Sequence, residues 1–147
     1  MEKADVENLL LSGVSVTLPL SGSSMCPLFA DGRDRIAVKP VTPDQKFRRL
    51  DVVLYRRPGD RLILHRIYKV KADGLYLVGD NQTQIEGPLS SSQVRGIMVG
   101  AIRKGKPFSV TAPGYRLYSH FWMLIRPLRP FVLGILMKIW RKIRPVK

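Results

Sequence analysis

Two residue types are scarce in this chain of 147 residues, and their scarcity excludes several classes of site. Cys26 is the single cysteine, which excludes an internal disulfide and a cysteine-based zinc site. His65 and His120 are the only histidines, and no spaced cluster of carboxylates accompanies them. We therefore expect chemistry that needs neither a metal nor another cofactor.

The sequence also lacks long apolar runs, and it has no acidic residue after residue 86. The most apolar stretch, residues 131–139, is far shorter than the ~20 residues of a membrane-spanning helix. Residues 1–86 hold 13 basic and 11 acidic side chains, whereas residues 87–147 hold 12 basic and none acidic. This asymmetry indicates an anionic partner, either an acidic lipid surface or a nucleic acid.

Between residues 14 and 111 the chain consists of short runs rich in Val, Ile, Leu and Tyr, separated by Gly, Pro and Asp. This pattern predicts a mainly β fold, with a compact antiparallel domain over residues 1–112. A short amphipathic helix at residues 1–11 precedes its first strand. Turns at residues 58–60 and 72–74 make the strand between them pair with both of its neighbours. The predicted strands are residues 14–20, 35–39, 51–56, 61–70, 74–78, 93–103 and 107–111.

Residues 113–147 form a separate segment that is both apolar and basic. An amphipathic helical segment in the membrane interface fits residues 115–147, because apolar side chains enter the acyl boundary while Lys and Arg meet lipid phosphates. We therefore expect a membrane-associated protein, peripheral or C-terminally anchored, with an anionic membrane surface as partner. Packing of this segment on the β domain and a distorted membrane span are the alternatives.

Three polar residues from separate parts of the chain form a candidate catalytic set. Ser24 follows the first predicted strand, in a turn next to glycine and proline that can expose its hydroxyl. Serine is a weak nucleophile and needs a base nearby, and His65, with an ordinary pKa near 6.5, can take and return its proton. Asp80 can accept the Nδ1 proton of His65 and fix the tautomer that turns Nε2 toward the serine.

The turn around Ser24 also provides a candidate oxyanion and substrate-binding site at Gly22, Ser23 and Met25, because a glycine-containing turn lets N–H groups converge. Cys26 is a rival nucleophile that lies two residues from Ser24. No separate base is indicated for it, and a lone cysteine is usually a small buried hydrophobe.

Each of these residues also has an ordinary interpretation. Alternation along residues 62–67 places His65 on the face of Ile63 and Ile67, where a half-buried histidine is common. Asp80 precedes asparagine and can end a strand in a turn. Their combination, more than any single residue, favours catalysis.

Four short boxes follow one another along the chain: GSSMCP at residues 22–27, RLDVVLY at 49–55, LHRI at 64–67 and GDN at 79–81. Their order resembles that of the type I signal peptidases, within the signal peptidase and repressor-protease superfamily. The resemblance implies a β-rich fold with a peptide-binding groove, and hydrolysis of a peptide or preprotein substrate after small residues. It also implies Ser24 as nucleophile, His65 as base and Asp80 as the third member of the set.

The sequence departs from the family pattern at three places. Most bacterial relatives use a lysine base where this chain has His65, which is similar to the endoplasmic-reticulum, archaeal and some Gram-positive signal peptidases. Gly22 stands where many bacterial relatives have a serine that assists the oxyanion hole. The family's N-terminal membrane anchor has no counterpart here, and we expect residues 115–147 to replace it.

Two other functions remain as alternatives, and a third is disfavoured. A dedicated maturation protease for one specific peptide would keep the same site. The disfavoured one, a self-cleaving repressor, would need a preceding DNA-binding domain and a lysine base, and we expect neither, since the base box carries His65. A non-enzymatic basic β domain could bind anionic lipid or nucleic acid; nucleic acid is not expected, because aromatic residues gather in the basic tail and not among basic residues on the strands.

Overall fold

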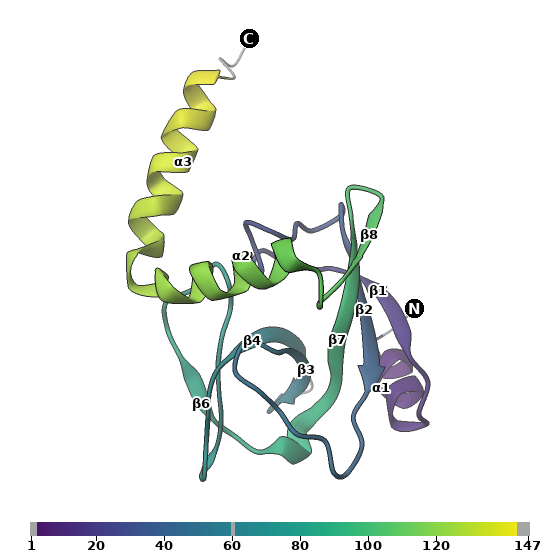
Figure 1. The fold of residues 1–147 in the computed structure, drawn as a ribbon. Coiled ribbons are helices and arrows are strands. Elements are labelled where there is room, and N and C mark those ends of the chain that lie inside the picture. Colours follow the sequence, from purple (N-terminus) through teal and green to yellow (C-terminus); the bar gives the residue numbers. More distant parts are fainter. Residues whose placement is uncertain (1–2, 60, 144–147) are drawn as a thin grey trace.

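The computed structural model describes residues 3–59 and 61–143 (Figure 1). Within them the chain runs through α1 (Lys3–Leu11), β1 (Val16–Pro19), β2 (Arg35–Pro40), β3 (Val52–Arg57), β4 (Arg61–Lys71), β5 (Gly74–Val78), β6 (Glu86–Leu89), η1 (Ser91–Gln93), β7 (Val94–Arg103), β8 (Lys106–Ser109), α2 (Pro113–Leu124), η2 (Arg126–Leu128) and α3 (Arg129–Ile143).

The strands pair in the order β1-β2-β7-β3-β4-β5-β6, β8 pairs with β7, and every pairing is antiparallel. The predicted mainly β fold with a helix at each end is therefore confirmed. The predicted pairing of the middle strand with both neighbours is also confirmed, since β4 pairs with β3 and β5. Of the first turn that the sequence predicts, Asp60 lies outside the described residues.

Two features of the sheet were not predicted. Strand β6 contains Gly87 and Pro88, residues that weaken a strand signal and that sheets accept mainly at an edge, where β6 lies. Strand β7 lies between β2 and β3, so the sheet is not a simple succession of hairpins. The position of β7 depends on pairings between residues far apart in the chain, such as Ala37 with Gly100.

The core lies on both sides of the central strands. Val52 and Leu54 of β3 belong to one buried cluster, whereas Val53 and Tyr55 belong to the other. His65 forms a ladder pair with Val53, on the face of the sheet that carries Ile63 and Ile67. The face predicted for His65 is thus confirmed, and the next residue of β4, Arg66, points to the opposite side.

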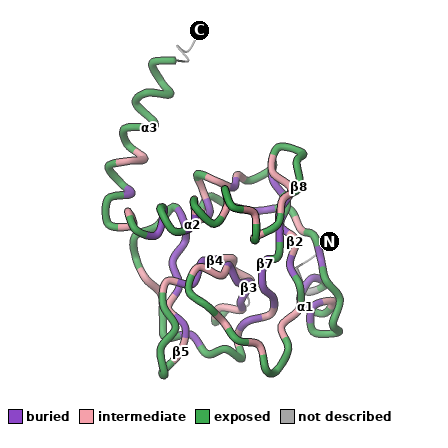
Figure 2. Tube along the Cα trace, in the orientation of Figure 1, coloured by how far each residue is buried: buried purple, intermediate pink, exposed green. Residues whose placement is uncertain are grey.

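The two long C-terminal helices differ in their contacts. Helix α2 lies across the β domain and buries Ser119, Trp122 and Met123 (Figure 1). Helix α3 projects away from the domain, and beyond its first turns its residues are mostly exposed (Figure 2). Among the described residues, no helix combines the length and the apolar character that a membrane span requires.

Candidate active site

The turn that carries Ser24 is fixed to the β domain on both sides of the serine. Met25 and Phe29 are buried in the core, at 1% and 0% exposure. Gly22 has a φ of +82°, a conformation that favours glycine, and its N–H donates to Oδ2 of Asp31 at 3.0 Å. Ser24 itself is partly exposed. The core therefore holds the turn in place and leaves the serine near the surface.

The turn of Ser24 adjoins Gly79, the residue directly after β5. The carbonyl oxygen of Ser24 accepts a hydrogen bond of 2.8 Å from the N–H of Asn81, and a Cβ atom at Gly79 would lie 2.8 Å from that same oxygen. A glycine is therefore needed for the turn to approach so closely. Strand β5 pairs with β4 up to Val78, which lies opposite Arg66, the residue after His65. The serine turn therefore packs at the end of β5, the strand that pairs with the strand of His65.

The ring of His65 is held on one side by a network from β3 and β6. Its Nδ1 lies 3.2 Å from Oη of Tyr55, and that hydroxyl donates to Oε2 of Glu86 at 2.7 Å. Arg57 donates to the same carboxylate at 3.0 and 2.5 Å. We call Tyr55, Arg57, His65 and Glu86 the His65 network.

The other ring nitrogen of His65 remains available. The His65 side chain is only 5% exposed. Yet among the described residues every buried side-chain nitrogen or oxygen has a hydrogen-bond partner, and Nε2 makes no hydrogen bond with any of them. Nε2 is therefore in contact with solvent. The hydroxyl oxygen of Ser24 likewise forms no hydrogen bond within the described part of the chain, so Oγ of Ser24 and Nε2 of His65 are not hydrogen-bonded to each other.

Burial sets the protonation of this network. It lowers the pKa of His65 below 6.5, an effect that Arg57 reinforces and that Glu86 and Asp80 oppose. Burial would raise the pKa of Glu86, but hydrogen bonds from Arg57 and Tyr55 outweigh it and leave that pKa below its usual value. At neutral pH the imidazole is thus neutral and the carboxylate charged, which is the state that a general base requires.

Within the described part of the chain Asp80 makes no hydrogen bond with the ring of His65, so the structure does not show the orienting contact predicted for it. Both of its carboxylate oxygens accept hydrogen bonds of 2.9 Å from Arg66, and Oδ2 also accepts one of 3.1 Å from Tyr118. The physical reason is strand alternation, because Arg66 points to the side of the sheet opposite His65 and reaches Asp80 under α2. In place of Asp80, Tyr55 pairs with Nδ1.

Asp80 acts instead as an anchor for the turn that supports Ser24. Arg66 also donates to Ser119 of α2 at 2.9 Å, and Trp122 donates to the carbonyl oxygen of Asp80 at 2.7 Å.

Arg129 of α3 holds the same turn, because it donates to the carbonyl oxygens of Gly79 and Gln82 at 3.0 and 2.8 Å. We call Asp80, Arg66, Tyr118 and Ser119 the Asp80 cluster.

The candidate oxyanion donors differ in their contacts. The N–H of Gly22 is already bound to Asp31, so Gly22 shapes the turn. The N–H groups of Ser23, Ser24 and Met25 make no hydrogen bond within the described residues. They are therefore the donors that the turn leaves available.

Cys26 is a poor rival to the serine. It is a free, partly buried cysteine, and burial raises the pKa of its thiol. A raised pKa disfavours the thiolate, which is the nucleophilic form. Among residues 3–59 and 61–143 there is also no group of three or more His, Cys, Asp or Glu that could hold a metal ion.

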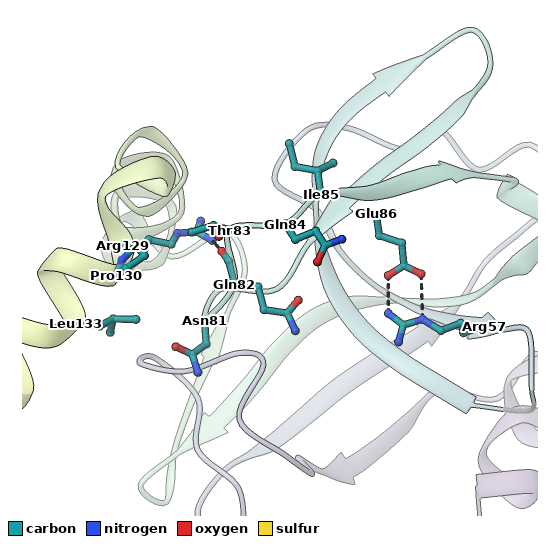
Figure 3. A pocket seen from close by; sticks show the side chains of 10 residues that line it. All are labelled: Arg57, Asn81, Gln82, Thr83, Gln84, Ile85, Glu86, Arg129, Pro130 and Leu133. Carbon is teal, nitrogen blue, oxygen red and sulfur yellow. Dashed lines mark hydrogen bonds and ion pairs between the residues drawn. The ribbon is translucent and has the colours of Figure 1, made fainter.

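A groove of about 700 Å³ runs along residues 81–86 and the first turns of α3 (Figure 3). Arg57 and Glu86 line one part of it, Asn81 and Gln82 another, and Leu133 faces them from α3. The groove thus extends from the carboxylate of the His65 network to the turn that contacts Ser24.

The sequence boxes did not single out Tyr55 and Glu86 as functional residues. Tyr55 ends the RLDVVLY box, which indicated only a strand. Glu86 lies in no box, and the pairing of β5 with β6 brings it to the site.

No protein-family model, no curated protein and no solved structure matches this chain. Its function is therefore inferred from its own residues.

Proposed function

We propose that the chain is a serine endopeptidase of the type I signal peptidase kind, which cleaves signal or leader peptides after small residues. One observation carries the proposal: Tyr55 holds His65 through Nδ1 while Nε2 makes no hydrogen bond within the described residues, and the turn of Ser24 packs at the end of β5, the strand that pairs with the His65 strand β4. A histidine held in this way can act as a general base, and the serine turn supplies the candidate nucleophile. The four boxes that resemble the signal peptidases supply the reaction class.

In the proposed reaction, Oγ of Ser24 attacks the scissile carbonyl carbon and Nε2 of His65 takes the hydroxyl proton. The N–H groups of Ser24 and Met25 bind the oxyanion that forms. The imidazolium then returns the proton to the leaving amine. In the second half of the reaction Nε2 takes a proton from a water molecule that attacks the acyl-enzyme, and it gives this proton to Oγ of Ser24 as the acyl group leaves. The hydroxyl has to rotate toward Nε2 when substrate binds, since hydrogen bonds at catalytic sites often tighten only in the complex.

The proposed partner of the C-terminal helices is an anionic membrane surface. On α2, Leu117, Phe121 and Leu124 are 73%, 56% and 77% exposed, on the side away from the buried Trp122. On α3, Ile135 and Trp140 are 58% and 60% exposed. These apolar side chains accompany a segment without acidic residues, a composition that suits an interface of acyl chains and lipid phosphates.

The peptidase proposal is tested by cleavage of signal-like peptides with small residues before the scissile bond, in the presence of lipid vesicles. We expect Ser24→Ala and His65→Ala to lose nearly all turnover, because each removes a reacting group. Cys26→Ala is the matched control from the same turn and should keep most of it. Unchanged cleavage by Ser24→Ala would eliminate the serine mechanism.

The membrane proposal has an internal fluorescent reporter, because the chain contains two tryptophans, Trp122 and Trp140, and Trp122 is 4% exposed. In Trp122→Phe, the emission of Trp140 should shift to shorter wavelength with phosphatidylglycerol vesicles and not with phosphatidylcholine vesicles. Ile135→Asp should weaken this binding, whereas Val70→Asp, at a 46% exposed site on β4, should not. Equal loss in both variants would contradict a surface on α3.

A further inference from the structure

We propose that Tyr55 and Glu86 are the positioning residues of His65, in the place that sequence reasoning gave to Asp80. The inference rests on the proposed function, in which His65 is the base, and it deepens that function by naming what orients the ring. It stands on the hydrogen-bonded series from Nδ1 through Oη of Tyr55 to Oε2 of Glu86, at 3.2 and 2.7 Å.

The hydrogen count of this series decides the tautomer of the histidine. The carboxylate of Glu86 is charged, holds no hydrogen and can only accept. Tyr55 has a single hydroxyl hydrogen, and it points to Glu86. The Tyr55 oxygen must then accept from Nδ1, so the ring carries its hydrogen on Nδ1 and its lone pair on Nε2. That lone pair is the one that can take the proton of Ser24.

The same arrangement stabilises the charge that forms during the reaction. When Nε2 takes a proton, the positive imidazolium has the Glu86 carboxylate 3.9 Å from its Nδ1. Arg57 holds that carboxylate in place from the other side. No proton needs to pass along the series, because its effect is orientation and charge compensation.

The other charged groups near the ring do not replace Glu86. Arg57 opposes protonation of His65, and Asp80 favours it only through space, because its oxygens are bound to Arg66 and Tyr118. Among the described residues that shift the pKa of His65, Glu86 is therefore the anion connected to the ring by hydrogen bonds.

The tautomer is measured directly by nitrogen-15 NMR of the histidine ring in the full-length chain, without substrate. Wild type should show the hydrogen on Nδ1. Tyr55→Phe should give a mixture of tautomers, because Nδ1 loses its acceptor. Tyr76→Phe is the matched control, since it removes a tyrosine-to-carboxylate hydrogen bond, to Asp73, on the exposed surface. A wild-type ring with its hydrogen on Nε2, or an unchanged tautomer in Tyr55→Phe, overturns the proposal.

Kinetics give a second measurement, and a second variant guards against poor folding of Tyr55→Phe. Glu86→Gln removes the anion but keeps an acceptor, so the pKa of His65 should fall and the acidic limb of kcat/KM should move to lower pH. We expect kcat of Tyr55→Phe to fall on the order of 10²-fold, as for loss of a positioned base, with little change in KM. An acidic limb that stays in place in Glu86→Gln, or a fall confined to KM in Tyr55→Phe, overturns the proposal.

The two proposals fail in different ways. If the chain cleaves no peptide, the peptidase function is contradicted. If the ring hydrogen of His65 nevertheless lies on Nδ1 in wild type, and Tyr55→Phe changes the tautomer, the positioning of His65 is supported. A chain that cleaves through Ser24 with its hydrogen on Nε2 supports the peptidase function and contradicts the positioning.

Discussion

Asp80 and Glu86 are carboxylates at the two ends of one connecting segment, and the structure gives them opposite tasks. The carboxylate of Asp80 and the guanidinium of Arg66 are both fully buried, and their pair lies between the sheet and α2. Glu86 and Arg57 are 32% and 36% exposed and line a groove. An ion pair between a carboxylate and an arginine is therefore fully buried in one region and partly exposed to solvent in the other.

The difference shows how burial separates support from chemistry. A fully enclosed ion pair can hold segments together, but neither charge is free to respond to a substrate. In the His65 network, solvent reaches one ring nitrogen while the other is fixed. This partial exposure is what a proton-transfer group needs, because its charge changes during the reaction.

Asp80→Asn should be the most damaging of the substitutions that test this comparison. It leaves Arg66 as a buried charge without its counterion, a change that costs roughly 3–5 kcal/mol in the free energy of unfolding. Urea denaturation followed by circular dichroism measures it. The double variant Asp80→Leu with Arg66→Met removes both charges and should recover part of the loss; a double variant as unstable as Asp80→Asn would contradict the charge explanation.

Ser119→Ala should have a smaller effect on the same cluster. It removes one acceptor of Arg66, while the hydroxyl of Tyr115 and the carbonyl of Leu50 still accept from that nitrogen. The expected loss is about 1–2 kcal/mol in the free energy of unfolding, measured by urea denaturation. Ser109→Ala, at an exposed serine, is the control and should change stability by less than ~0.5 kcal/mol.

The comparison also shows what the sequence could predict. Alternation was enough to place His65 on the correct face, and turn residues were enough to predict the pairing of β4. The partner of Asp80 could not be chosen, because His65 and Arg66 are adjacent in sequence and point to opposite faces. Only the backbone path after Val78 directs the carboxylate to Arg66. Glu86 was missed because the β5–β6 pairing that positions it is irregular and has no strand signal.

As the pH falls, protonation of His65 should lower the free energy of unfolding before protonation of the buried acidic groups does. Burial lowers the pKa of His65 in the folded chain, so between that value and ~6.5 the unfolded chain binds more protons. The free energy of unfolding should therefore decrease as the pH falls below about 6.5. His65→Gln should flatten this decrease in denaturation curves recorded at several pH values.

The carboxylate of Glu7, on α1, loses its contribution to stability at a lower pH than His65 does. Arg56 lowers the pKa of Glu7 to about 2, with Arg95 adding to this and burial opposing it. Its contribution to stability is present above 4.5, the ordinary value, and is lost as the pH falls toward 2. An unchanged pH dependence above pH 5 in His65→Gln would contradict the assignment to the histidine.

Glu86→Gln should have the smallest effect on stability, even though its effect on the protonation of His65 is central to the proposed site. Both members of its ion pair with Arg57 are about one-third exposed, and pairs of this kind contribute ~0.2–1 kcal/mol because solvent screens them. Urea denaturation of Glu86→Gln beside Asp80→Asn measures the contrast. If the two variants lost equal stability, burial would not be what separates the two carboxylates, and Glu86 would be a structural residue like Asp80.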